Sequence, residues 1–249
     1  MTDIILSGCM GKMGREVSQM VSQRDDCRIV AGVDVCPDSA DFPVHRSFNE
    51  FIEAADVIID FSNAAVVTSV LDYAVKNAVP AVICTTGLSE EQVAYLKEFS
   101  RSVPVFWSAN MSIGVNLVTE LAKTAAKVLS GFDIEIVEAH HRRKLDAPSG
   151  TAFMIADSIS SVMQEKPRYE YDRHSRREQR PENEIGIHSV RGGTIVGEHE
   201  IIFAGEDEVV KISHSAGSRR IFANGSINAA IYLKNRRNGL YTMKDLINE

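Results

Sequence analysis

A dense cluster of imidazole and cationic side chains lies between His140 and Lys144, where two histidines are followed directly by three cations. Placing so many cations together is electrostatically costly, so the cluster favours a site for an anionic ligand. Histidine titrates near neutral pH and can transfer protons, whereas lysine can donate a proton or hold a carboxylate as a point charge. These residue types predict acid–base chemistry on a small acidic substrate.

The segment after this cluster predicts the start of a helix and a second place for an anion. Pro148 precedes Ser149, whose hydroxyl can cap a helix, and Gly150 has no side chain to block a ligand. The free N–H groups of the first turn would bind an anion beside the cations. A metal site on His140 and His141 is disfavoured, because neighbouring side chains point to opposite faces of a strand and no cysteine or third histidine is nearby in the sequence.

Three glycines near the N-terminus, Gly8, Gly11 and Gly14, follow directly after a short apolar strand. Such a loop lets the backbone turn tightly and approach a pyrophosphate, which the next helix binds with its N-terminus. Asp34 ends the following strand about twenty residues later, where an acid would hold the ribose hydroxyls of NAD. An acid there repels a 2′-phosphate and Val35 adds no positive charge, which favours NADH over NADPH unless Lys12 or a distant arginine compensates.

The rest of the chain predicts the elements that position these residues, and the fold class is α/β. Strands that are apolar on both faces alternate with helices up to residue 107, which predicts a parallel sheet covered on both faces. Strands joined by short turns predominate later, which predicts a second, open mixed sheet. We expect strands at residues 4–6, 28–34, 57–61, 81–84, 103–107, 133–138, 185–190, 194–203 and 208–215, helices at 13–21, 47–55, 65–76, 89–99, 113–129, from about 149, and 221–234, and an exposed charged loop at 164–184.

The composition excludes several classes of protein. The 249 residues carry a net charge of −7, which disfavours nucleic acid and anionic membranes as partners. No apolar run long enough to span a membrane and no signal peptide is visible, so the expected compartment is the cytoplasm. The four cysteines contain no CxxC pair, which disfavours a zinc site or a disulfide framework.

The string EAHHRRKLDAPSGTA at residues 138–152 resembles the signature of the 4-hydroxy-tetrahydrodipicolinate reductase (dihydrodipicolinate reductase) family of diaminopimelate and lysine biosynthesis. The resemblance covers nearly the whole chain. Its other matching segments are Gly8–Gly14, Asp60–Ser62, Thr85–Gly87, Ser108–Ser112, Arg191–Gly193, Gly197–His199 and Phe222–Gly225. It implies hydride transfer from NADH or NADPH to an unsaturated cyclic imine dicarboxylate, with an acid completing the reduction.

The resemblance also implies roles for individual residues. His140 matches the family's acid–base histidine and Lys144 its proton donor, while His141, Lys144, Gly150 and Thr151 match its substrate-binding groups. The implied cofactor contacts are Gly8, Cys9, Met10, Gly11, Lys12, Met13, Asp34, Cys84, Thr85, Thr86, Ser108, Ala109, Asn110 and Met111. On the same basis we expect two domains: a Rossmann-type dinucleotide-binding domain at 1–112 and 219–249, and a substrate-binding and oligomerisation domain at 113–218. The resemblance also implies that the two domains close on each other and that the protein forms a homotetramer.

The sequence departs from the family pattern in two places, and it is also compatible with two other functions. Val35 stands where some members have a basic residue, and the segment 173–180 is more charged than the family leads us to expect. Another dehydrogenase of small dicarboxylates or amino acids is possible, although a semialdehyde-type enzyme needs a nucleophilic cysteine after Cys84. A non-catalytic NAD-sensing protein would lack the proton donors His140 and Lys144, which are both present.

Overall fold

The computed structural model describes residues 1–50, 54–174 and 176–248 and divides the chain into two compact units. The larger unit contains residues 1–113 and 219–249, and the smaller unit contains residues 114–218. Each unit has its own sheet and its own buried apolar side chains. In the described part of the chain, no helix has the length and apolar character needed to cross a membrane.

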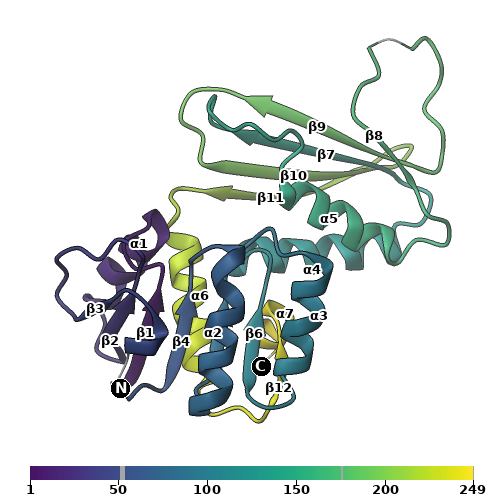
Figure 1. Ribbon diagram of the computed structural model, residues 1–249. Coiled ribbons are helices and arrows are strands. Elements are labelled where there is room, and N and C mark those ends of the chain that lie inside the picture. The colour runs from purple at the N-terminus through teal and green to yellow at the C-terminus, as the bar shows by residue number, and fades with distance from the viewer. Residues whose placement is uncertain (51–53, 175, 249) are drawn as a thin grey trace. The chain divides into compact units, whose positions relative to one another are not determined.

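The larger unit is built on a parallel sheet of seven strands in the order β12-β6-β5-β4-β1-β2-β3 (Figure 1). The central strands are buried on both faces, because their side chains are apolar at successive positions. The strands are β1 (Thr2–Ser7), β2 (Cys27–Val33), β3 (Val44–His45), β4 (Val57–Asp60), β5 (Ala81–Ile83), β6 (Pro104–Trp107) and β12 (Gly239–Tyr241). The parallel sheet predicted from the alternation is confirmed.

Helices cover both faces of this sheet. One core joins the sheet to α1 (Lys12–Val21), α6 (Arg220–Leu233) and α7 (Met243–Ile247). The other core joins the opposite face to α2 (Ala64–Asn77) and α3 (Glu90–Phe99). Ser89 caps α3 in a capping box with Gln92, as the sequence predicts.

Several short elements of the larger unit were not predicted, and one predicted helix is wrong in its described part. Strands β3 and β12 and helix α7 lie in segments that the sequence pattern leaves unassigned. The helix expected at 47–55 is a single 3-10 turn, η1 (Phe48–Glu50), and residues 51–53 lie outside the described residues. Elements of two to five residues are too short for an apolar periodicity to develop.

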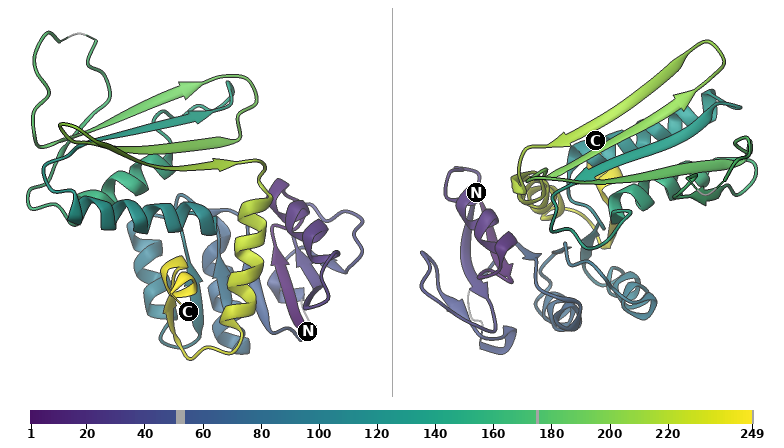
Figure 2. Two further views of the ribbon diagram at one scale, coloured as in Figure 1. Left: turned by 180° about the vertical axis from the view of Figure 1, so that it is seen from behind. Right: turned by 90° about the horizontal axis from the view of Figure 1, so that it is seen from above.

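The smaller unit contains a mixed sheet of five strands in the order β11-β10-β7-β9-β8 (Figure 2). Its strands are β7 (Asp133–His140), β8 (Arg168–Glu170), β9 (Glu184–Arg191), β10 (Gly197–Ala204) and β11 (Val209–Ala216). Strand β9 runs parallel to β7 and β8, whereas β10 is antiparallel to β7 and β11. One face packs on α4 (Ile113–Val128) and α5 (Gly150–Ser160), which confirms the predicted mixed sheet.

The charged stretch at 164–184 is mostly an exposed loop in its described part, as the sequence suggests, but its arginines are not simply solvated. It contains β8, and its arginines pair with carboxylates of the same unit. Arg173 binds Glu184 and Arg176 binds Glu170, and both acids are buried. Arg180 contacts the carboxylates of Asp133 and Glu135 at 2.6 and 3.0 Å. Buried carboxylates need partners, so the arginines order a segment that has little apolar content.

Candidate active site

The carboxyl ends of the parallel strands lie level in the larger unit. Ser7 at the end of β1 pairs with Val33 of β2 and Asp60 of β4, and Ile83 of β5 pairs with Asp60 and with Trp107 of β6. The loops that follow these strands therefore leave the sheet at one edge. All the predicted cofactor-binding residues lie in these loops or at the start of α1, which is the edge where open α/β sheets bind ligands.

The glycine loop is held closely against the sheet. Gly8 has φ +74°, and a Cβ at this position would lie 2.6 Å from the carbonyl oxygen of Phe61. A Cβ on Gly14 would lie 2.6 Å from Cα of Cys9. Helix α1 begins at Lys12, and its N-cap, Gly11, makes no side-chain capping bond. The first N–H groups of α1 are thus left for an anion, as a pyrophosphate-binding loop requires.

A pocket of about 360 Å³ lies beside this loop. It is lined by Ser7, Gly8, Gly11, Val33, Asp34, Val35, Arg46, Ser47, Phe48, Phe61, Ser62, Asn63, Val66 and Ser69. Asp34 accepts hydrogen bonds from the N–H groups of Met10 at 3.0 Å and Cys36 at 3.1 Å, which ties the glycine loop to the end of β2. The pocket combines a phosphate-binding loop with an acid, and these groups fit the adenosine half of a dinucleotide.

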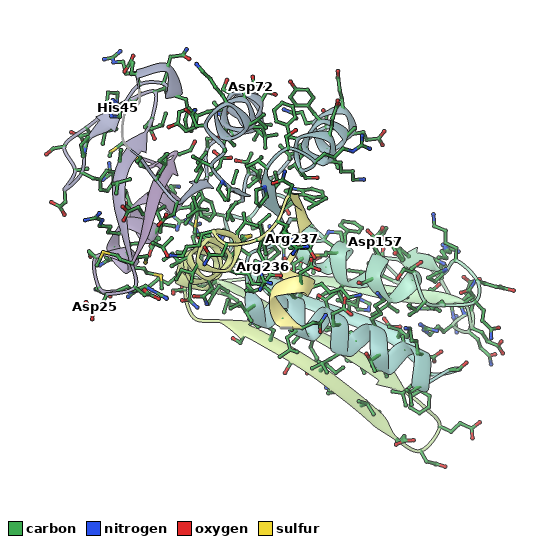
Figure 3. All side chains as sticks on the ribbon, turned by 90° about the horizontal axis from the view of Figure 1, so that it is seen from below. Asp25, His45, Asp72, Asp157, Arg236 and Arg237 are labelled. Atoms are coloured by element: carbon green, nitrogen blue, oxygen red, sulfur yellow. The ribbon has the colours of Figure 1, made fainter. Side chains whose placement is uncertain are left out.

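Two polar residues that directly follow strand β3 also line this pocket, and the sequence pattern did not reveal them. β3 carries His45, labelled in Figure 3, and the carbonyl of His45 accepts a hydrogen bond of 3.0 Å from the N–H of Asp34. The next residues, Arg46 and Ser47, therefore line the pocket opposite the end of β2. A two-residue strand gives no periodicity, so only the short polar stretch after β2 could have pointed to them.

The remaining predicted cofactor residues differ in how accessible they are. The thiols of Cys9 and Cys84 are buried, so any contact from these residues would come from the main chain. Thr85 is also buried, whereas Thr86 is exposed. In the turn after β6, the Ser108 hydroxyl donates to the Asn110 carbonyl at 2.7 Å, with exposed Ala109 between them and buried Met111 after them. The described lining of the 360 Å³ pocket does not include these residues.

Asp60 is a buried carboxyl group at the same edge of the sheet. It accepts hydrogen bonds from the hydroxyls of Ser62 at 2.6 Å and Thr85 at 2.7 Å. Burial raises the pKa of Asp60, against the opposing effect of these hydroxyl donors. Through these bonds Asp60 fixes the loop after β4 and the loop after β5 relative to each other.

The second cluster of predicted residues lies in the smaller unit, where β7 ends at His140. Nδ1 of His140 lies 2.6 Å from Oε2 of Glu138, which is fully buried. The other carboxylate oxygen accepts the N–H of Ser149 at 3.1 Å, and this contact closes the loop between β7 and α5. Glu138 thus links His140 to Ser149, the residue that caps α5.

The loop after β7 and the first turn of α5 carry the predicted substrate-binding residues. Ser149 caps α5 by accepting the N–H of Ala152 at 3.2 Å, so Gly150 and Thr151 form the first turn. A Cβ on Gly150 would meet no atom within 4 Å, which leaves the helix N-terminus open. Nζ of Lys144 lies 2.8 Å from the carboxylate of Asp146.

Two further histidines, His141 and His199, belong to this part of the smaller unit. Nδ1 of His141 is buried and has no hydrogen-bond partner among the described residues, although the residue as a whole is half-buried. His199 on β10 was not predicted: its Nε2 lies 3.1 Å from the Ser149 hydroxyl, and its ring centroid lies 5.3 Å from that of His140. In residues 1–50, 54–174 and 176–248, no group of three His, Cys, Asp or Glu side chains is arranged to hold a metal ion.

The buried position of His199 makes the stability of the protein depend on pH. Burial, and then the neighbouring His140, lower the pKa of His199 from 6.5 to about 4. Between about pH 4 and pH 6.5, His199 therefore binds a proton in the unfolded chain but not in the native protein. The free energy of unfolding falls as the pH falls through this range. From pH 8 to pH 5 the expected loss is about 2 kcal/mol.

Urea unfolding of the wild type and of His199→Gln at both pH values measures this effect. The glutamine cannot titrate, so the variant is expected to lose less stability on acidification than the wild type. Equal losses in the two proteins would contradict this assignment.

Comparisons with known proteins agree with this arrangement. Residues 2–111 match the family model "Dihydrodipicolinate reductase, N-terminus", and residues 114–247 match "Dihydrodipicolinate reductase, C-terminus". A 4-hydroxy-tetrahydrodipicolinate reductase of Caldanaerobacter subterraneus subsp. tengcongensis is 53% identical over 99% of this chain and 98% of its own length. The corresponding enzyme of Clostridium novyi is 46% identical over the same shares of the two chains.

Solved structures give the same result. The dipicolinate-bound dihydrodipicolinate reductase from Paenisporosarcina sp. TG-14 superposes with a TM-score of 0.80 at 28% identity, covering 97% of each chain. A probable dehydrogenase from Thermotoga maritima, 11% identical with a TM-score of 0.65 over 99% of this chain and 92% of its own, shares the fold. The chain belongs to the dihydrodipicolinate reductase family.

Proposed function

We propose that the protein reduces 4-hydroxy-tetrahydrodipicolinate to tetrahydrodipicolinate with NADH or NADPH, a step of diaminopimelate and lysine biosynthesis. The observation that carries this proposal is the cluster at the end of β7, where His140 and Lys144 lie in one loop with the open N-terminus of α5. The family to which the chain belongs supports the same reaction. We assign cofactor binding to residues 1–112 and 219–249, and substrate binding to residues 113–218.

The substrate is a small dicarboxylate, and the cluster offers separate groups for its charges. The N–H groups of Gly150 and Thr151, at the open N-terminus of α5, bind one carboxylate. Lys144 and the side chain of His141 bind carboxylate oxygens as cationic and hydrogen-bonding groups. Dipicolinate, the compound bound in the Paenisporosarcina structure, carries two carboxylates of the same kind.

Acid–base catalysis is assigned to His140 and Lys144. The nicotinamide supplies a hydride when it is bound. Replacing the 4-hydroxyl group by hydrogen takes one hydride and one proton and releases water; Lys144 donates the proton to the ring carbon next to the one that receives the hydride, while His140 exchanges protons with the substrate. The loop that carries both groups is tied to buried Glu138 and Ser149, so the proton donors are held in place before the substrate arrives.

The larger unit binds the nicotinamide cofactor. The contacts come from the loop at Gly8–Gly11, the first turn of α1 with Lys12 and Met13, Asp34, the turn at Cys84–Thr86 and the turn at Ser108–Met111. Asp34 repels a 2′-phosphate and favours NADH. Arg46 in the same pocket attracts a 2′-phosphate, so NADPH is also accepted, with a higher KM.

We also propose a homotetramer that forms through the smaller sheet. Exposed apolar side chains, including Val190 at 48% and Val209 at 56%, lie on β9 and β11 of this sheet. Covering such side chains stabilises an oligomer. Light scattering during size-exclusion chromatography gives the mass of the assembly directly, and a mass of one chain would contradict the proposal.

The proposed function is tested by following NADH and NADPH oxidation with the product of a coupled dihydrodipicolinate synthase reaction as substrate. Oxidation that depends on this substrate is expected with both cofactors and is faster with NADH at equal concentration. Arg46→Ala is expected to raise KM for NADPH and to leave KM for NADH unchanged. No oxidation by a folded protein that binds NADH would exclude the reductase and favour a binding protein.

A further inference from the structure

Two charged residues of the smaller unit, Glu138 and Arg191, do not themselves act on the substrate in the reaction proposed above, but Glu138 contacts His140 and Arg191 contacts Glu138. We propose that they form a positioning pair that holds the His140 ring with a proton on Nδ1 and with Nε2 as the atom that exchanges protons with the substrate. This inference rests on the proposed function, because it takes His140 as the acid–base group.

Glu138 is a carboxylate in the core of the smaller unit. Glu138 is 0% exposed, and it follows Ile134 and Ile136 along the buried face of β7. An isolated charge in such a place is very unfavourable, and Arg191 compensates it with two parallel hydrogen bonds of 2.8 and 2.7 Å. Burial raises the pKa of Glu138, but the hydrogen bonds from Arg191 and His140 outweigh it and hold the pKa at about 2.

The ionised state of Glu138 determines which nitrogen of His140 carries a proton. A carboxylate can only accept hydrogen bonds, so the 2.6 Å contact to Nδ1 of His140 requires a hydrogen on Nδ1. That hydrogen stays in place whether the ring is neutral or cationic. The proton that leaves or arrives must therefore be the one on Nε2.

Nε2 of His140 lies beside a glycine. It faces Gly197 of β10, where a Cβ would lie only 3.1 Å away. A glycine therefore keeps space beside the atom that exchanges the proton. Neutral His199, whose ring packs edge-on against that of His140, adds no second positive charge at neutral pH.

Arg191 also fixes the loop that carries Lys144. Its Nη2 donates to the carbonyl of Asp146 at 2.6 Å, and Asp146 in turn binds Nζ of Lys144 at 2.8 Å. The N–H of Gly192, the next residue, donates to the carbonyl of His140 at 2.9 Å. One buried ion pair thus positions both proposed acid–base groups.

The same sheet contains a matched control for this pair. Glu135, also on β7, accepts hydrogen bonds from Nε2 of His188 at 2.7 Å and from Nε of Arg180 at 3.0 Å. Like Glu138 it binds one histidine and one arginine, but it binds none of the residues proposed for catalysis, and its side chain is 24% exposed. Glu135→Gln therefore reports the general effect of removing a carboxylate from β7.

The first test is the protonation of the His140 ring, read from long-range ¹H–¹⁵N spectra of the whole protein at alkaline pH. The signals of His140 are assigned with a His140→Gln variant. A hydrogen on Nδ1 and a bare Nε2 are expected in the wild type and in Glu135→Gln, and a mixture of both tautomers in Glu138→Gln. A wild-type ring with its hydrogen on Nε2 would overturn the proposal, whatever the enzyme reduces.

The second test is kinetic. Glu138→Gln is expected to lower kcat about 100-fold, within the range that general acid–base groups contribute, and to leave the Kd for NADH unchanged. Glu135→Gln should keep the wild-type kcat. Glu138→Asp should recover part of the loss, because it restores a carboxylate. Equal kcat values for Glu138→Gln and Glu135→Gln would refute a positioning role.

A third variant keeps the test valid if Glu138→Gln is unstable because Arg191 is left unpaired. The double variant Glu138→Gln/Arg191→Gln removes both charges and is expected to regain stability, since no lone buried charge remains. Its kcat should stay low. Recovery of kcat together with stability would mean that the pair acts only on folding.

Discussion

Lys144→Met is expected to lower kcat by about 10²–10⁴-fold and to raise KM for the dicarboxylate substrate, while the Kd for NADH stays within about threefold of the wild type. The substitution keeps the aliphatic part of the side chain and removes the ammonium group. Lys144 is half-buried, and within the described part of the chain its Nζ binds the side chain of Asp146, which is itself exposed. Its ammonium is therefore available to substrate, and its loss removes a proton donor and a carboxylate ligand together.

Arg143→Met provides the control for this prediction. Arg143 precedes Lys144 in the same loop and is exposed, so this substitution removes one cation from the cluster without removing a proposed proton donor. It should change kcat little. Steady-state kinetics in both substrates and NADH fluorescence titrations separate the two effects. Loss of NADH binding in Lys144→Met, with normal turnover of the bound complex, would contradict the role assigned to Lys144.

The sequence predicted those parts of the site that depend on local pattern. The glycine loop, the acid at the end of β2 and the N-cap at Ser149 are each recognisable within a few residues, because a turn, a strand end and a helix start have local requirements. The structure places Gly8 and Asp34 in one pocket and links both His140 and Ser149 to Glu138. The roles of these residues in binding and catalysis remain predictions.

The groups that were missed depend on pairing between distant strands. Glu138 occupies a buried position on β7, yet in the sequence it resembles its solvated neighbours, and only its bonds to Arg191, 53 residues later, explain it. His199 approaches Ser149 because β10 pairs with β7, and Arg46 reaches the pocket because β3 pairs with β2. No local pattern specifies such register. The ion pairs of the arginines in 164–184 were missed partly for the same reason, since Arg173 and Arg180 bind carboxylates on β9 and β7, although Arg176 binds Glu170 within the stretch.

Gly14→Ala is expected to destabilise the larger unit by about 3 kcal/mol, because an added methyl would overlap backbone atoms that cannot move independently. The overlapped atoms belong to Gly8 and Cys9, so the clash is between the first turn of α1 and the loop after β1. For a unit of this size the melting temperature should fall by about 6–12 °C. NADH binding should be lost with the fold of the loop, as titration at low temperature would measure.

Gly11→Ala separates loss of the fold from loss of the cofactor. Gly11 is exposed, and a Cβ there would lie 3.2 Å from a single backbone oxygen, so the expected destabilisation is only about 1 kcal/mol. The methyl would nevertheless stand in the pocket beside the free N–H groups of α1, where the pyrophosphate is expected, and should raise the Kd for NADH about tenfold or more. If Gly11→Ala binds NADH like the wild type, the phosphates bind elsewhere and the assignment of this loop is wrong.

If Gly14→Ala is as stable as the wild type, the tight contact between α1 and the loop does not contribute to the fold.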